Sequence, residues 1–178
     1  MNPSDELKKL TSLFPDGETL FERTEHVPSA LTPEPCKRLL VHEHHMTVTM
    51  EEFYRTSVVV NVLDRKLDGD IYSRKILLRR EDDFRVVQFG IVRFDLSVVL
   101  PAVRTEILSE KTPLGRILIN YNVLRHIDLG AILQLAAGPG LARLLDCPAG
   151  QTMYGRLATI FCNQKPAVDL LEVAAPVR

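Results

Sequence analysis

The sequence predicts an α+β fold built on one antiparallel β-sheet. Three observations lead to this prediction: stretches rich in β-forming residues, polar links of hairpin length between some of them, and a helical interruption in the middle of the series. Because the links at residues 81–83 and 163–166 are too short for a crossover, the strands that they join are expected to be antiparallel. The predicted strands are residues 56–63, 71–80, 84–95, 154–162 and 167–174.

Helices are predicted mainly between the third and fourth of these strands, where the apolar residues follow a helical pattern. A further helix is expected shortly before the first strand, and a turn through Met46 and Thr47 should lead from it towards that strand. The predicted helices are residues 36–45, 101–110, 113–121 and approximately 128–145, the last with a break at 138–140.

The first 35 residues are predicted to be an N-terminal helix followed by an extended arm. Residues 4–13 place leucines three apart behind Ser4, which is a suitable helix cap. Residues 15–35 are rich in Pro, Thr and Glu and show no sustained period. A chain of 178 residues matches one domain, so we expect a single domain over residues 1–178 with residues 1–35 as its arm.

Composition excludes several classes of partner and location. The 22 Lys and Arg residues balance 23 Asp and Glu residues, so no overall basic field favours nucleic acid or an anionic membrane. Three widely spaced cysteines without a CxxC pair argue against a disulfide framework and a zinc ribbon, and they fit a reducing compartment. No secretory segment opens the chain, and charged, Gly and Pro residues interrupt its most apolar stretch. We therefore expect a soluble cytoplasmic protein without membrane insertion; the oligomeric state is not indicated.

Four ionisable side chains share strand faces with apolar residues. Side chains two apart lie on one face of a strand, and this rule places Arg74, Glu172, Arg93 and Arg156 in apolar rows. A charge in such a place needs a partner or a ligand. The simpler explanation is that Arg74 or Arg156 pairs with Glu172 inside the sheet, or that the strand register is shifted by one residue. The alternative is a site for an anionic ligand.

The segment from Lys111 to Arg116 adds a second indication of an anion site. Thr112 is a good helix cap, Pro113 is favoured at the first helical position, and Gly115 lets a ligand approach the backbone. The free N–H groups of such a helix start can receive an anion. The alternative is an ordinary capped helix in which Gly115 serves packing alone.

Neither a metal nor an organic cofactor is expected. His42 and His45 would share a helix face, but no convincing third and fourth ligands accompany them. Cys162 has apolar neighbours and no adjacent histidine, which is typical of a packed thiol. The sequence contains no serine nucleophile elbow, phosphate-binding loop or dinucleotide fingerprint.

Taken in order, four segments resemble the chorismate pyruvate-lyase family. The resemblance covers roughly residues 36 to 176, and its most recognisable element is Pro-Leu-Gly-Arg at residues 113–116. The four segments are His45-Met46-Thr47, Tyr72-Ser73-Arg74-Lys75-Ile76-Leu77-Leu78, Thr112-Pro113-Leu114-Gly115-Arg116-Ile117-Leu118, and Leu170-Leu171-Glu172-Val173 before Pro176.

This resemblance implies an α+β domain whose antiparallel sheet and flanking helices cover a buried ligand site. It implies a carbon-oxygen lyase that eliminates pyruvate from chorismate without a cofactor and leaves a hydroxybenzoate, with 4-hydroxybenzoate expected, for ubiquinone or aromatic secondary-metabolite biosynthesis. Arg74 would hold the ligand carboxylate and Glu172 would exchange a proton near the ring oxygen, which makes these two the predicted catalytic residues. Met46, Leu114 and Gly115 would bind substrate beside them.

A second function remains open. The same fold resembles the effector domains of some transcription regulators, in which an inward arginine would hold a ligand carboxylate without turnover. The alternative prediction is therefore a non-catalytic domain that binds a small aromatic carboxylate.

Overall fold

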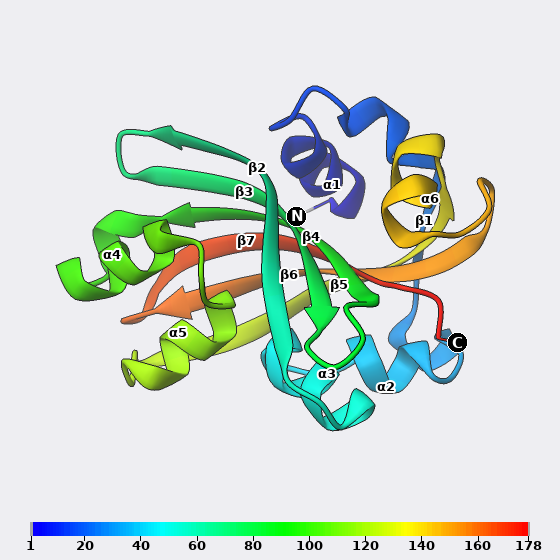
Figure 1. The fold of residues 1–178 in the computed structure, drawn as a ribbon. Helices are drawn as coiled ribbons and strands as arrows, with labels where there is room; N and C mark the ends of the chain where they lie inside the picture. Colours follow the sequence, from blue (N-terminus) through cyan, green and yellow to red (C-terminus); the bar gives the residue numbers. More distant parts are fainter. Residues whose placement is uncertain (1, 178) are drawn as a thin grey trace.

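A computed structural model describes residues 2–177 and shows one seven-stranded sheet in which all neighbouring strands are antiparallel (Figure 1). The strand order is β1-β5-β6-β7-β4-β3-β2. The predicted α+β class with a single antiparallel sheet is confirmed. The strands are β1 (Phe21–Val27), β2 (Val58–Asp68), β3 (Ile71–Arg80), β4 (Val86–Asp95), β5 (Arg125–Ala137), β6 (Thr152–Cys162) and β7 (Lys165–Ala174).

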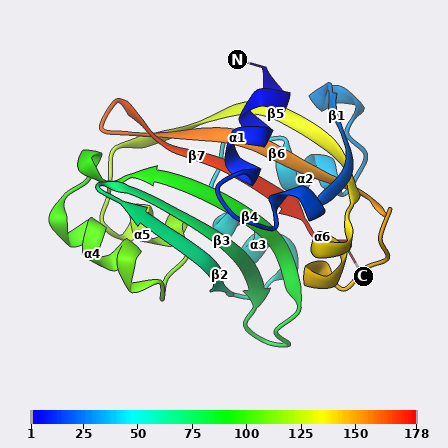
Figure 2. The ribbon, with the colours of Figure 1, turned by 90° about the horizontal axis from the view of Figure 1, so that it is seen from above.

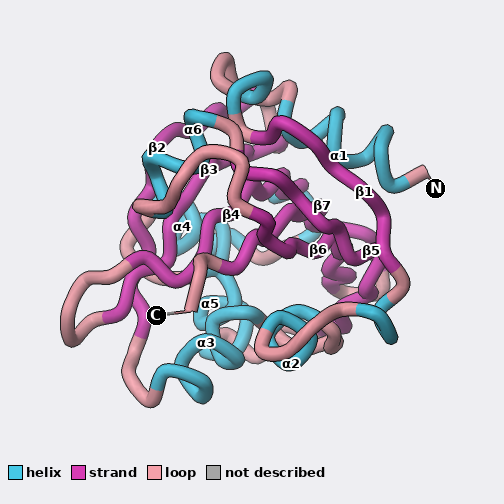
Figure 3. Tube along the Cα trace, turned by 90° about the vertical axis from the view of Figure 1, so that its right-hand side faces the viewer, coloured by secondary structure: helices cyan, strands magenta, loops and turns pink. Residues whose placement is uncertain are grey.

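Helices cover both faces of the sheet, as Figures 1 and 3 show. On one face, which we call the α1 face, lie α1 (Pro3–Thr11) and α6 (Pro139–Leu145). On the other, which we call the α3 face, lie α2 (Cys36–Leu40), α3 (Met46–Tyr54), α4 (Pro101–Ser109) and α5 (Leu114–Asn120). None of the helices in the described part of the chain is long and apolar enough to span a membrane.

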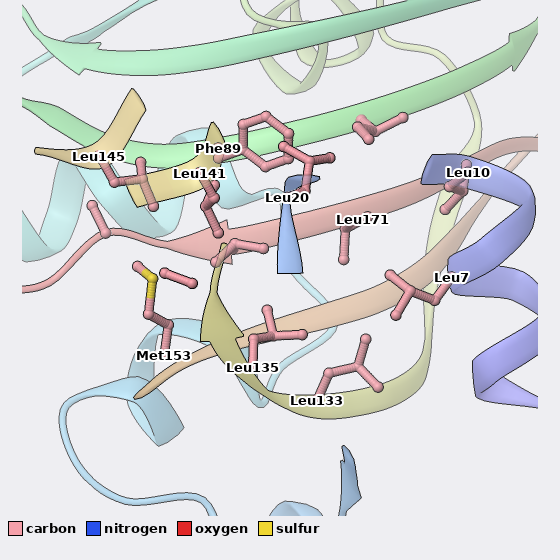
Figure 4. Close-up of a cluster of buried hydrophobic side chains, with 14 of the residues drawn as sticks. Leu7, Leu10, Leu20, Phe89, Leu133, Leu135, Leu141, Leu145, Met153 and Leu171 are labelled. Atoms are coloured by element: carbon pink, nitrogen blue, oxygen red, sulfur yellow. The ribbon is translucent and has the colours of Figure 1, made fainter. Parts of the chain in front are cut away.

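The α1 face carries the most continuous apolar core. Seen from above, α1 crosses the strands near the middle of the sheet (Figure 2), and Leu7 and Leu10 pack from it against Phe89 and Leu171 (Figure 4). Lys75 points to this face, where its ammonium contacts the Asp16 carboxylate at 2.6 Å. The face of β3 that bears Lys75 is therefore the one opposite Arg74.

The α3 face is apolar at both ends and polar in the middle. One cluster packs around Tyr72, Phe94 and Ile160 beneath α4 and α5, and another packs around Ile76 and Met50 beneath α2 and α3. Between them lie four buried polar side chains from four adjacent strands: Arg74, Gln88, Arg156 and Glu172. Because buried polar groups are costly without partners, this interruption of the core marks the region where a site is expected.

The predicted hairpins are present, and local backbone geometry explains the tighter one. Residues 81–85 connect β3 to β4, and Asn163 and Gln164 connect β6 to β7. Asn163 and Gln164 have φ values of 52° and 67°. Two successive left-handed residues produce the turn whose twist matches a pair of antiparallel strands.

The prediction of a helix over residues 128–137 is wrong, because these residues belong to β5. Only residues 139–145 of that prediction are helical, after the expected break. A leucine- and alanine-rich segment has a helical preference in isolation. Here β1 and β6 flank the segment and helices cover both faces, so tertiary packing overrides that preference.

Two N-terminal predictions are also corrected. Residues 15–35 do not remain an arm, because residues 21–27 form β1 and pair with β5 at the edge of the sheet. The helix over residues 36–45 ends at Leu40, and residues 46–54, expected to turn into a strand, form α3. Val48 and the neighbouring threonines disfavour a helix, but Met46 and Met50 lie four apart and are both buried against the sheet. The first helix begins at Pro3, and Asn2 rather than Ser4 caps it.

Candidate functional site

A cavity lies over the polar centre of the α3 face, between the sheet and the N-terminal ends of α3 and α5. Its volume is about 40 Å³, counted as the space open to the centre of a water-sized sphere. All five predicted ligand-contacting residues line it: Met46, Arg74, Leu114, Gly115 and Glu172. The remaining lining residues are mostly apolar, and the polar ones among them are His45, Thr47, Gln88 and Arg156. The structure thus brings together residues that the sequence separates by up to 126 positions, from Met46 to Glu172.

Arg74 is a buried cation with an unused hydrogen-bond donor. It lies on β3 opposite Val92 of β4 and is only 2% exposed. Its Nη1 atom has no hydrogen-bond partner among the described residues. Burial lowers the pKa of Arg74 from its usual value, while Tyr72 and Glu110 oppose that change. Because an arginine does not lose its proton in a protein, the guanidinium remains a cation able to receive an anion.

Glu110, which lies outside the cavity and opposes the lowering of the Arg74 pKa by burial, already accepts hydrogen bonds from other residues. Glu110 follows α4 and accepts hydrogen bonds from the Tyr72 hydroxyl at 2.7 Å and from Arg65 Nη1 at 2.5 Å. Burial first, and then the contact with Glu110, raise the pKa of Tyr72 to about 12. Tyr72 therefore stays protonated at neutral pH and donates to Glu110.

Arg156, unlike Arg74, is completely paired. Its Nε donates to Glu172 Oε2 at 2.7 Å, and the Arg156 side chain is 1% exposed. Its Nη1 donates to the His42 carbonyl at 2.9 Å, and its Nη2 donates to the His44 carbonyl at 3.0 Å. The interpretation that an inward arginine pairs with Glu172 is therefore confirmed for Arg156. Arg74 is left without that partner.

Arg93 does not belong to the site. Its row on β4 points to the α1 face, where Arg93 is half-buried and lies 3.7 Å from the Asp169 carboxylate. The apolar row that contains it was identified correctly, but a twisted sheet with helices on both sides has two apolar faces. Two charged side chains can therefore both point into apolar surroundings and still lie on opposite faces of the sheet, as Arg93 and Arg74 do.

Gln88 is the site residue that the sequence reasoning missed. It is 2% exposed, lines the cavity, and its Nε2 donates to Glu172 Oε1 at 3.3 Å. Its Oε1 has no hydrogen-bond partner among residues 2–177. The signal was present in the second row of β4, where Gln88 alternates with Gly90 and Val92. The other row of β4, with Val87, Phe89 and Ile91, is the more apolar one and therefore indicated a buried face by itself.

The histidine cluster, His42, His44 and His45, forms hydrogen bonds with two arginines beside the cavity. Arg125 Nε donates to His45 Nε2 at 2.8 Å, and the backbone N–H of His44 donates to His42 Nδ1 at 3.1 Å. His42 Nε2 therefore carries the proton and contacts the Leu39 carbonyl at 2.7 Å. Burial and neighbouring arginines lower the pKa of both His42 and His45 to about 4. Both rings are neutral at pH 7 and accept hydrogen bonds.

The start of α5 differs from its prediction. Pro113 occupies the cap position without a side-chain cap bond, and Thr112 instead donates its hydroxyl hydrogen bond to Glu106 at 2.9 Å. A Cβ atom on Gly115 would lie 2.8 Å from His45 Cβ and 3.0 Å from Thr47 Oγ1. Gly115 therefore permits close packing of α5 on the start of α3, beside the cavity that it also lines.

Comparisons with known proteins place the fold. No protein-family model matches this chain, and no curated protein sequence matches it either. Solved structures do match. The effector domain of PhnF from Mycobacterium smegmatis is 11% identical with a TM-score of 0.52, over 74% of this chain and 88% of that one. The ligand-binding domain of a Bordetella bronchiseptica protein described as a GntR-family transcriptional regulator is 12% identical with a TM-score of 0.51, over 66% and 85%.

The structure of PhnF itself is also similar. It is 12% identical to this chain with a TM-score of 0.53, and the match covers 78% of this chain and 66% of PhnF. The chain has the chorismate lyase-like fold. At this level of identity, the similarity establishes the architecture alone.

The predicted lyase activity is wrong. The structures that match include the ligand-binding domain of a GntR-family transcriptional regulator and the effector domain of PhnF, so the expected carbon-oxygen lyase and its place in ubiquinone or aromatic secondary-metabolite biosynthesis are withdrawn. The segments that carried the resemblance shape the sheet and its cavity, and one fold of this kind serves both binding and catalysis. Glu172, predicted to exchange a proton, is held by Arg156 and Gln88.

The neutral state of His45 predicts a pH dependence of stability. Between the ordinary histidine pKa of 6.5 and the lowered value of about 4, the unfolded chain binds protons that the folded chain does not. The free energy of unfolding should therefore fall as the pH falls from 6.5 to 4. In His45→Gln, where an amide oxygen can still accept from Arg125, this slope should decrease by up to about one proton per molecule. Urea unfolding at several pH values measures it.

His26→Gln is the matched control, because His26 lies exposed on edge strand β1. Its slope should equal that of the wild type. An unchanged slope in His45→Gln would contradict the assignment of a neutral, acceptor His45.

Gly115→Ala should destabilise the protein although alanine is the better helix former. The new methyl group would overlap His45 at 2.8 Å, and overpacking of this kind costs about 1 to 3 kcal/mol. Chemical unfolding measures the change. Equal or greater stability would show that α3 and α5 are not packed as described.

Proposed function

We propose that this domain binds a small aromatic carboxylate, such as a hydroxybenzoate, without converting it. One observation carries the proposal: a buried arginine with an unpaired guanidinium nitrogen lines a mainly apolar cavity. The unpaired Nη1 of this cation can donate a charge-assisted hydrogen bond to a carboxylate oxygen. The mostly apolar lining of the cavity suits an aromatic ring.

The unpaired Nη1 of Arg74 is a cost to the folded protein that a ligand can remove. A buried donor without a partner destabilises a fold by about 1 to 3 kcal/mol. Such a group persists in proteins mainly at sites that need it for recognition. A bound carboxylate would supply both the missing acceptor and the missing opposite charge.

The similar solved structures support a binding role. Two of them are, by their descriptions, the ligand-binding domain of a GntR-family transcriptional regulator and the effector domain of PhnF. We infer that this domain likewise responds to a ligand, and that ligand binding in the cavity reaches the surface through the loop His42–His45, which Arg156 holds to the sheet. The cytoplasmic location expected from the sequence stays a prediction, as do the single-domain organisation and the ligand roles of Met46, Leu114 and Glu172.

Arg74→Met should abolish most ligand affinity and leave the fold intact. Losing one partner of a buried, charge-assisted contact typically costs about 2 to 5 kcal/mol, which is roughly 30-fold or more in the dissociation constant. Because the variant also removes an unsatisfied buried donor, the ligand-free protein should be as stable as the wild type or more stable. Calorimetric titration with 4-hydroxybenzoate and thermal unfolding without ligand measure the two effects.

Arg93→Met is the matched control, because it makes the same chemical change on the opposite face of the sheet. It should leave the affinity unchanged. Similar losses in both variants, or no binding of benzoates to the wild type, would overturn the proposed function.

Incubation with chorismate should release no pyruvate above the rate without protein. Glu172 already accepts hydrogen bonds from Arg156 and Gln88, so it is not arranged as a free acid or base. A coupled assay with lactate dehydrogenase measures pyruvate. Release that disappears in Arg74→Met would show that the cavity is catalytic after all.

A further inference from the structure

The Gln88 side chain has only one orientation that suits its neighbours. Glu172 is held as a carboxylate by Arg156 at 2.7 Å, and an ionised carboxylate only accepts hydrogen bonds. The group of Gln88 that faces Glu172 must therefore be the amide NH₂, as the 3.3 Å contact from Nε2 to Oε1 shows. The amide carbonyl is directed away from Glu172, where no described residue donates to it.

The cavity thus has two unsatisfied groups of opposite kind. Arg74 Nη1 is a donor that lacks an acceptor, and Gln88 Oε1 is an acceptor that lacks a donor. Both residues are 2% exposed and both line the cavity. A molecule with a carboxylate alone satisfies only the first of them.

The sheet register sets the distance between these two groups. Arg74 lies opposite Val92 on β4, four residues from Gln88, so their rows are about 13 Å apart along the strand. The row between them contains Gly90, Ile76 and Glu172. The Ile76 side chain packs against Gly90 in this middle row, where a Cβ atom on the glycine would lie 3.3 Å from Ile76 Cδ1. The Gln88 side chain reaches from its own row towards this middle row, where its Nε2 contacts Glu172 at 3.3 Å, and this shortens the gap that a ligand has to span. Side-chain rotations of the kind that are common on binding would adjust the rest.

We propose that Gln88 is the specificity residue of this site: its carbonyl accepts a hydrogen bond from a hydroxyl or amino group that the ligand carries away from its carboxylate. This inference rests on the proposed function, and it narrows the ligand class from aromatic carboxylates to those that also bear a hydrogen-bond donor.

The physical basis of the selectivity is the penalty for the wrong ligand. A carboxylate without a donor would fill the cavity, exclude water, and leave the Gln88 carbonyl buried and unpaired. Sites that contain buried polar groups discriminate strongly against analogues that cannot satisfy them, more strongly than apolar pockets discriminate by size. We expect a difference of roughly 10- to 100-fold in the dissociation constant.

The experiment compares benzoates of similar size on the full chain. Calorimetric titration uses 4-hydroxybenzoate and 3-hydroxybenzoate as donor ligands, and 4-fluorobenzoate and benzoate as ligands without a donor. The wild type should bind the better hydroxybenzoate roughly 10- to 100-fold more tightly than 4-fluorobenzoate. In Gln88→Met the hydroxybenzoate should bind no more tightly than 4-fluorobenzoate, whose own affinity should remain.

Gln134→Met is the matched control. Gln134 is a half-buried glutamine on β5 that contacts the Tyr154 hydroxyl at 3.3 Å and does not line the cavity. This variant should keep the wild-type preference. Gln88→Asn is the second test variant, because it keeps a buried amide at this position but draws both its NH₂ group and its carbonyl back by one methylene. It too should lose most of the preference, including in the event that Gln88→Met does not fold.

The outcomes separate this inference from the proposed function. If no benzoate binds, the proposed function fails. If 4-fluorobenzoate binds as tightly as both hydroxybenzoates, the proposed function stands and the role of Gln88 is refuted. If the preference is present in the wild type and survives in Gln88→Asn and in a folded Gln88→Met, another acceptor such as Glu172 recognises the hydroxyl, and the inference is again refuted.

Discussion

The buried ion pair between Arg156 and Glu172 is the interaction on which the site depends. It joins β6 to β7 at the centre of the α3 face, and it uses the one carboxylate that lines the cavity. Since Glu172 is already engaged, Arg74 remains a cation without a carboxylate partner in the cavity. Glu172 of this pair also accepts a hydrogen bond from the Gln88 NH₂ group. The Gln88 carbonyl therefore points away from Glu172 and has no hydrogen-bond donor among the described residues. The recognition groups of the cavity are consequences of where this pair forms.

The pair also organises the wall of the cavity. Arg156 donates to two carbonyl groups of the loop between α2 and α3, and Arg125 donates to His45 at the end of that loop. The contact from Arg125 requires a neutral His45, and burial first, then the neighbouring arginines, lower the pKa of both His42 and His45 to about 4. Gly115 then lets α5 approach the same loop. The cavity and the loop are therefore physically linked through Arg156.

Sequence reasoning predicted the direction of two buried charged side chains correctly, whereas the activity inferred from the resemblance was wrong. Alternation along β3 and β7 was enough to aim Arg74 and Glu172 towards apolar surroundings, because a strand has a strict period of two. Gln88 was missed because it lies in the less apolar row of β4. A polar residue in such a row is expected to face solvent unless helices are known to cover that face of the sheet. The lyase activity was inferred from segments that shape the sheet and cavity, and such segments are compatible with binding as well as turnover.

The sequence by itself determined the α+β class, most of the strands, the hairpins and the inward direction of Arg74, since these depend on local periodicity and turn chemistry. Tertiary structure decided that residues 125–137 form a strand and that residues 46–54 form a helix, because packing on both sheet faces outweighs local preference. It also decided that Arg156, and not Arg74, pairs with Glu172. That choice depends on strand order: β6 lies beside β7, whereas β4 separates β3 from β7, and no local pattern encodes which strands are neighbours.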